Sequence, residues 1–192
     1  MNYQDYIWDL GGTLLDNYET STAAFVHTLQ DFGLTGSHDE VYKALKVSTE
    51  YAVRQFAPGN KEFLKSYKAN EAKELEHPIL FEGASELLAQ IIQQGGRNFL
   101  ISHRDDQVLE ILQKTQIGLY FTEVVTAING FKRKPDPESM LYLKDKYQIQ
   151  SGLVIGDRPI DVEAGQAAGF SCYLFDNMRN LEEFVDIELE KE

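Results

Sequence analysis

Cysteine is nearly absent from this chain, because Cys172 is the only one among 192 residues. A single thiol cannot form an internal disulfide, and no partner for a catalytic thiol is evident. We therefore interpret Cys172 as a small core residue. No apolar run approaches the ~20 residues needed to span a bilayer, so we expect no membrane partner. The first residues lack the basic start and apolar stretch of a signal peptide, which makes a cytoplasmic protein the expectation.

Positive charge is also scarce. The chain has 18 lysines and arginines against 31 aspartates and glutamates, which gives a formal net charge of −13. Such a surface repels phosphate backbones, so we expect no nucleic-acid partner. The charge mainly favours solubility. An anionic substrate would need a local cationic group to offset this field, and any lysine or arginine beside a candidate site gains interest for that reason.

The chain does contain a clear alternation of two hydrophobic periodicities. From Gly83 onward, short apolar runs alternate with segments whose apolar residues recur at helical spacing. We expect strands at 5–9, 98–102, 123–127, 152–156 and 172–175. We expect helices at 82–96, 105–115, 137–147, 161–169 and 180–192. This alternation predicts an α/β fold with a five-stranded parallel sheet, helices on both faces and right-handed crossovers.

The stretch between the first strand and the rest of the sheet differs, because it contains no convincing strand. Its apolar residues recur at helical spacing, and Ser37 followed by Glu40 fits a capping box at a helix start. The two flanks of the stretch resemble paired linkers. We therefore expect a Rossmann-like core formed by residues 1–16 and 78–192, with an inserted helical cap at residues 17–77.

Polar side chains follow several of the expected strands immediately. Asp9 follows the first strand, and Ser102 and His103 follow the run "NFLI". Asp157 follows "LVIG", and Lys134 lies in a loop before an expected helix. Parallel strands bring their carboxyl ends to one edge of the sheet, where doubly wound folds bind their ligands. The sequence therefore predicts a functional site at this edge.

Four short motifs in this order resemble those of the haloacid dehalogenase superfamily of hydrolases, over nearly the whole chain. They are "DLGGT" at 9–13, "FLIS" ending at Ser102, "KPDP" beginning at Lys134, and "GDRPID" with Asp157 and Asp161. Each motif is weak evidence alone, whereas all four on a five-strand pattern are specific. Most members of this superfamily are Mg²⁺-dependent phosphatases, and the helical insertion resembles the cap of its phosphoglycolate phosphatase-like members. The resemblance implies a hydrolase of a small phosphorylated metabolite.

The resemblance also implies a role for each motif residue. Asp9 would be the nucleophile that forms an aspartyl phosphate, which divides a difficult hydrolysis into two easier steps. Ser102 would donate a hydrogen bond to the phosphoryl oxygens, and Lys134 would neutralise them and keep Asp9 ionised. The expected Mg²⁺ ligands are Asp9, the backbone carbonyl of Gly11, Asp157 and Asp161. The expected contacts to the substrate come from Gly12, Thr13, Ser102, His103 and Lys134.

Gly11 departs from the superfamily pattern, which has a second aspartate at this position. That aspartate acts as the general acid for the leaving group and then as the general base for the water. Gly11 keeps the backbone carbonyl for the metal and loses the carboxylate. General acid–base catalysis contributes ~10²–10⁴-fold in rate, so we expect weak activity on generic phosphate esters.

Three explanations of Gly11 stay open at the level of sequence. Another group, such as His103 or Asp16, could supply the proton step. Alternatively, the leaving group needs no proton, as in the phosphonoacetaldehyde hydrolases, which cleave a C–P bond through a Schiff base on a cap lysine; Lys43 and Lys46 are candidates. The third explanation is a non-catalytic protein that binds a phosphorylated ligand or a partner. Oligomeric state stays open as well.

Overall fold

The computed structural model describes residues 3–74, 76–104 and 107–189. The chain divides into two compact units. The first, here called the α/β unit, combines Met1–Leu15 with Leu80–Glu192. The second, here called the helical unit, is Asp16–Ile79. In the described part of the chain, no helix combines the length and the apolar character needed to cross a membrane.

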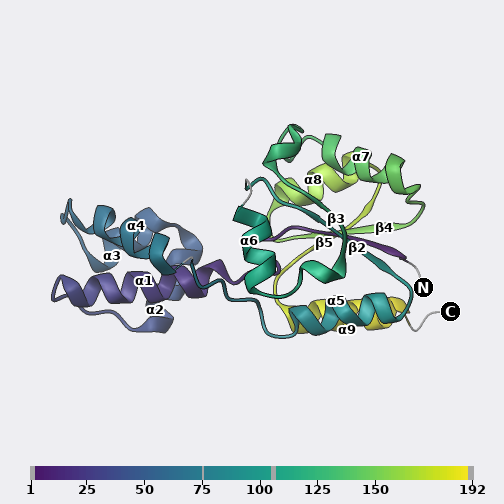
Figure 1. Cartoon of the computed structure of the whole chain (residues 1–192). Coiled ribbons are helices and arrows are strands. Elements are labelled where there is room, and N and C mark those ends of the chain that lie inside the picture. Colours follow the sequence, from purple (N-terminus) through teal and green to yellow (C-terminus); the bar gives the residue numbers. More distant parts are fainter. Residues whose placement is uncertain (1–2, 75, 105–106, 190–192) are drawn as a thin grey trace. The chain divides into compact units, whose positions relative to one another are not determined.

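A five-stranded sheet of parallel strands forms the centre of the α/β unit, in the order β3-β2-β1-β4-β5 (Figure 1). The strands are β1 (Asp5–Trp8), β2 (Arg97–Ile101), β3 (Phe121–Val125), β4 (Gly152–Gly156) and β5 (Ser171–Leu174). In the register, Trp8 lies opposite both Leu100 and Ile155, so β1, β2 and β4 end side by side. The predicted α/β fold with a Rossmann-like parallel sheet is confirmed.

Helices cover both faces of the sheet, because successive residues of a strand point to opposite faces. Tyr6 and Trp8 pack with apolar residues of α5, α6 and α9, whereas Ile7 packs with those of α7 and α8 (Figure 1). The helices are α5 (Ala84–Gln93), α6 (Gln107–Lys114), α7 (Glu138–Tyr147), α8 (Pro159–Ala167) and α9 (Met178–Leu189), with short 3₁₀ turns η1 (Gly118–Tyr120) and η2 (Ala127–Asn129). The predicted helices at 105–115 and 180–192 extend beyond the described residues at 105–106 and 190–192.

The helical unit consists of α1 (Asn17–Asp31), α2 (His38–Val47), α3 (Thr49–Phe56) and α4 (Phe63–Glu74). Phe25 is fully buried at its centre, with ring centroids 4.9 Å from Phe63 and 5.0 Å from Tyr67. The predicted capping box is present, because Glu40 contacts the backbone N–H of Ser37 and the Ser37 hydroxyl accepts from the N–H of Glu40. Aromatic packing of this kind gives the unit a core of its own.

A buried asparagine, Asn98, links the sheet by hydrogen bonds to α5 and η1. The indole Nε1–H of Trp8 donates to Oδ1 of Asn98 at 2.9 Å. The side-chain amide of Asn98 donates to the carbonyls of Leu88, at 3.0 Å, and of Tyr120, at 3.4 Å. Asn98 is fully buried. One side chain therefore satisfies the buried indole N–H of β1 and bonds to carbonyls of α5 and η1 as well.

Replacing this asparagine should destabilise the α/β unit without disturbing the chemistry at the strand ends. Asn98→Leu leaves the buried Trp8 N–H unpaired, at ~1–3 kcal/mol, and removes the hydrogen bonds to the carbonyls of Leu88 and Tyr120. We expect the free energy of unfolding to fall by about 2–4 kcal/mol, measured by urea denaturation. Gln93→Leu, an exposed change on α5, is the matched control and should stay within ~0.5 kcal/mol of the native value. Equal effects of the two substitutions would contradict the role given to Asn98.

Candidate active site

The ends of three neighbouring strands position the site. Asp9 directly follows β1, and its backbone N–H donates to the carbonyl of Ile155 at 2.9 Å, which continues the pairing with β4. Ser102 directly follows β2, and its N–H donates to the carbonyl of Val125 at 2.9 Å. Asp157 follows the last residue of β4. Backbone pairing therefore fixes where these three residues leave the sheet.

Lys134 joins this edge from the loop between β3 and α7. Its Nζ lies 2.5 Å from Oδ1 of Asp9 and 2.5 Å from Oδ1 of Asp161, and it also donates to the carbonyl of Ile101 at 3.4 Å. The lysine is only 5% exposed, so its ammonium is held almost wholly by protein oxygens. A buried charge persists only when it is paired and hydrogen-bonded, and these contacts meet that condition. The sequence could not have revealed the Ile101 contact, because every residue offers such a carbonyl.

Three carboxylates gather at the same place. Oxygens of Asp9, Asp157 and Asp161 all lie within 4.8 Å of one another. Burial raises the pKa of Asp157 to about 6, and the neighbouring charge of Asp9 adds to the shift. Burial also raises the pKa of Asp9, while the ammonium of Lys134 opposes that rise. Three carboxylates and one ammonium leave an excess of negative charge, which a divalent cation would offset.

The donor set fits Mg²⁺, which prefers oxygen ligands and commonly takes one or two carboxylates. Asp161 is the least available of the three. Its Oδ1 meets Lys134, and its Oδ2 accepts from the N–H of Arg158 at 3.1 Å, which closes the start of α8. Asp161 therefore caps the start of α8 and pairs with the Lys134 ammonium at the same time. Asp9 and Asp157 are the better candidates for direct Mg²⁺ ligands. Asp161 holds the Lys134 ammonium in place.

The loop after β1 folds tightly against Asp157. Gly12 has φ = 81°, and a Cβ at this position would collide with the Asp157 carboxylate. The N–H of Gly12 donates to the carbonyl of Leu15 at 2.9 Å, so this predicted phosphate donor is used within the loop. Thr13 is fully buried, with Oγ1 at 3.5 Å from Oδ1 of Asp157. Thr13 thus lies against the Asp157 carboxylate and can orient it.

Gly11 directly precedes Gly12 in this loop. It forms an isolated parallel β-bridge with Leu15. Left-handed φ is recorded at its neighbour Gly12 and not at Gly11. The left-handed backbone therefore accounts for the glycine at position 12. It does not account for the glycine at position 11.

His103 contacts Lys134 through its ring. Nε2 accepts a hydrogen bond from the backbone N–H of Lys134 at 2.7 Å, which places the proton of the neutral ring on Nδ1. Burial, followed by the charges of Lys134 and Arg133, lowers the pKa of His103 to about 4. A neutral ring with Nε2 already engaged is suited to holding the Lys134 loop. This contact favours a role of His103 in orienting the Lys134 loop over a role in proton transfer.

The other residues considered for the missing proton step or for a Schiff base belong to the helical unit. Oδ1 of Asp16 accepts from the N–H of Glu19 at 3.0 Å and caps α1. Nζ of Lys46 lies 5.0 Å from the ring centroid of Tyr42 and 5.7 Å from that of Tyr18. Stacking of this kind stabilises the protonated ammonium, whereas a Schiff base requires the neutral amine. Lys43 is exposed on α2.

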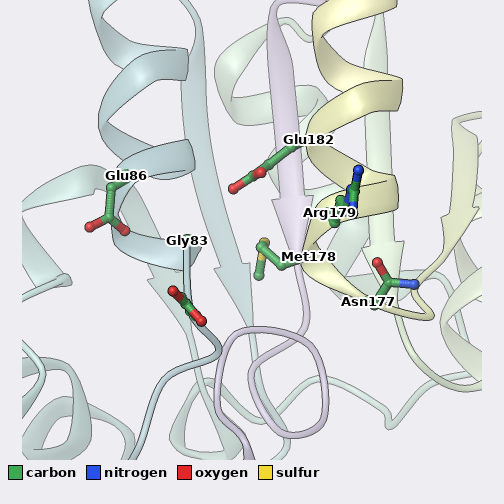
Figure 2. Close-up of a pocket in the computed structure, with 7 residues that line it drawn as sticks. Gly83, Glu86, Asn177, Met178, Arg179 and Glu182 are labelled. Carbon is green, nitrogen blue, oxygen red and sulfur yellow. The ribbon is translucent and has the colours of Figure 1, made fainter.

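A separate cavity of about 650 Å³ lies where α5 and α9 begin, within the α/β unit (Figure 2). Its lining combines Met178 and Arg179 with three glutamates, Glu82, Glu86 and Glu182. A Cβ on Gly83 would collide with the Glu182 carboxylate, so that carboxylate lies against the backbone. An acidic lining disfavours a phosphorylated ligand. The strand ends therefore remain the candidate site for one.

Comparison with solved structures supports the fold. A hydrolase from Streptococcus pneumoniae is 69% identical, with a TM-score of 0.93, and the match covers 97% of this chain and all of that one. A haloacid dehalogenase-superfamily hydrolase from Geobacter sulfurreducens is 20% identical, with a TM-score of 0.72 over 97% of this chain and 96% of that one. The second likeness supports the fold alone.

Comparison with known proteins and with the sequence pattern of a family identifies the family of this chain. The phosphoglycolate phosphatase of Aliivibrio fischeri is 28% identical over 189 residues, covering 88% of this chain and 81% of that protein. The phosphoglycolate phosphatase of Vibrio parahaemolyticus is 24% identical over 186 residues, covering 86% and 80%. The pattern of the family described as "Haloacid dehalogenase-like hydrolase" matches residues 6–175, which include every motif of the strand-end site. The chain therefore belongs to the haloacid dehalogenase-like hydrolases.

Proposed function

We propose that this hydrolase is a Mg²⁺-dependent phosphatase of a small phosphorylated metabolite, acting through an aspartyl phosphate on Asp9. The observation that carries the proposal is the contact of Lys134 Nζ with Asp9 Oδ1 at 2.5 Å, beside the carboxylate of Asp157. The relatives named phosphoglycolate phosphatase support a small anionic substrate.

Each residue then has a definite task. Lys134 holds Oδ1 of Asp9 and keeps the carboxylate ionised, which leaves Oδ2 to attack phosphorus. Ser102, almost fully buried at the end of β2, donates its hydroxyl to a phosphoryl oxygen. Asp9, Asp157 and the Gly11 carbonyl would hold Mg²⁺, whose positive charge offsets the approach of one anion to another. His103 keeps the Lys134 loop in place.

A direct assay tests this assignment. Phosphoglycolate and acetyl phosphate are incubated with the whole protein, in Mg²⁺ and in EDTA, and released phosphate is measured. We expect release to require Mg²⁺ and to fall by about 10³-fold or more in Asp9→Asn, which removes the nucleophile and keeps the shape. Asp145→Asn, an exposed change on α7, is the matched control. Phosphate release by Asp9→Asn at the native rate would contradict the proposal.

Mg²⁺ should also stabilise the protein in the absence of substrate. A ligand at 100 times its Kd stabilises the folded state by about 2.7 kcal/mol, which appears as a rise in Tm. In Asp157→Asn one carboxylate ligand is replaced by an amide, so we expect most of this rise to disappear. Asp145→Asn should keep the full rise. A Tm that responds equally to Mg²⁺ in both variants would show that the metal binds elsewhere.

The His103 contact predicts a defined pH dependence of stability. The pKa of the folded-state histidine is about 4, below the ordinary value of ~6.5, so the folded state binds fewer protons than the unfolded state between these values. The stabilisation is fully present above about pH 6.5 and is lost as the pH falls towards 4.

The measurement compares His103→Gln with the native protein, since glutamine can still accept a hydrogen bond but does not titrate. We expect the free energy of unfolding of the native protein, relative to the variant, to fall between pH 6.5 and 4. His27→Gln, an exposed change on α1, is the matched control and should show no such fall. A constant difference between native protein and His103→Gln across this range would rule out the contact.

A further inference from the structure

We propose that the helical unit carries a binding site of its own, for a small amphiphilic carboxylate, in a cavity at the connection between α3 and α4. The cavity has a volume of about 290 Å³, close to the lower limit of ~300–1,000 Å³ for small-molecule sites. Its lining comes from residues 53–61. The proposal concerns a different part of the chain from the strand-end site and does not depend on the proposed phosphatase activity.

Hydrogen bonds hold this connection in a fixed shape. The N–H of Ala57 donates to the carbonyl of Val53 at 2.9 Å, and the N–H of Asn60 donates to the carbonyl of Ala57 at 3.3 Å. The side-chain Oδ1 of Asn60 then accepts from the N–H groups of Glu62 and Phe63, both at 3.2 Å, where α4 begins. A preformed cavity of this kind spares a ligand the cost of ordering the loop around it.

The floor of the cavity is apolar. Ala57 is only 1% exposed and belongs to the hydrophobic core of the helical unit, and Val53 packs against that core. Pro58 adds an apolar ring to the lining. A Cβ built on Gly59 would meet no atom within 4 Å, so the space beside this backbone is open. An alkyl chain placed in the cavity would leave water, which favours binding by about fourfold for each buried CH₂ group.

Two cations line the same cavity. Arg54 and Lys61 are both exposed, and the lining that the described residues form contains no carboxylate. Glu50, one turn before Arg54 on α3, lies outside the lining. In the described part of the chain neither cation forms an ion pair, unlike Lys68, which pairs with Glu71 at 2.8 Å. On a chain with a net charge of −13, this combination of an apolar floor and two available cations selects an anionic head with an apolar tail.

A structural role at the helix end does not account for these cations. Arg54 lies in the last turn of α3, where a positive charge stabilises the helix C-terminus. That role explains neither Lys61, which lies outside both helices, nor the apolar surface in the same cavity. A carboxylate head explains all three features, because a guanidinium pairs with a carboxylate through two parallel hydrogen bonds and an ammonium adds a point charge.

The size of the cavity favours a small molecule over a protein partner. A stable protein interface buries ~800 Å² on each side. The large apolar side chains that the described residues expose on the helical unit are not part of the lining; they are Val47, Tyr51, Leu64 and Ile79. The apolar surface at the α3–α4 connection is therefore a local one, suited to one short chain or ring.

The test titrates octanoate, butyrate and octylamine into the whole ¹⁵N-labelled protein and follows the backbone amide signals of Gly59 and Asn60. We expect octanoate to shift these signals with a millimolar or lower Kd. Butyrate should bind at least tenfold more weakly, because its tail is four CH₂ groups shorter. Octylamine has the same tail and the opposite charge, and we expect it to bind at least tenfold more weakly than octanoate.

Three variants connect the binding to the cavity. Arg54→Gln and Lys61→Gln should each raise the Kd for octanoate by about 2–5-fold, the size of one exposed ion pair, and the double variant should raise it further. Lys73→Gln is the matched control, because Lys73 is exposed in the last turn of α4, ~15 Å along the helix from its first residue. It should leave the Kd unchanged.

Several results would overturn the inference. They are a double variant that binds octanoate within twofold of the native Kd, octylamine binding as tight as that of octanoate, and amide shifts confined to the α/β unit. None of them bears on Asp9, whose role is decided by phosphate release.

Discussion

The buried contact of one ammonium with two carboxylates organises the whole strand-end site. Lys134 joins Asp9 to Asp161, and all three side chains are almost fully buried. Removing one partner from a buried ion pair costs ~3–5 kcal/mol, because the charge left behind has no compensation. The surrounding structure therefore has to bring three distant segments to within hydrogen-bond distance. The strand order, the tight turn at Gly12 and the His103 contact all serve that condition.

The sheet order supplies most of this convergence. β1 lies between β2 and β4, so the residues that follow these strands meet at the point where the strand order reverses. Asp161 follows one helical turn later and reaches back to the same place from α8. The loop that carries Lys134 is then held by a ring nitrogen of His103, which itself follows β2. Every contact of the site thus depends on the central strands.

Much of this arrangement was predictable from sequence. Strand-length runs alternating with helical spacing predicted the parallel sheet, and the same alternation placed Asp9, Ser102 and Asp157 at strand ends. Local patterns do not report long-range hydrogen bonds, so Asn98 gave no signal of its tie to Trp8. The use of the Gly12 N–H within its own loop was equally invisible, because a backbone donor has the same sequence letter whether it is free or paired.

The separation of the site residues along the chain has a consequence for how the protein matures. The ammonium that pairs with Asp9 comes from a residue 125 positions later, on the loop that follows β3. A nascent or partly unfolded chain therefore carries Asp9 as an ordinary, solvated aspartate. Under the proposed mechanism such a chain lacks an activated nucleophile, so reactivity arises only together with the completed sheet.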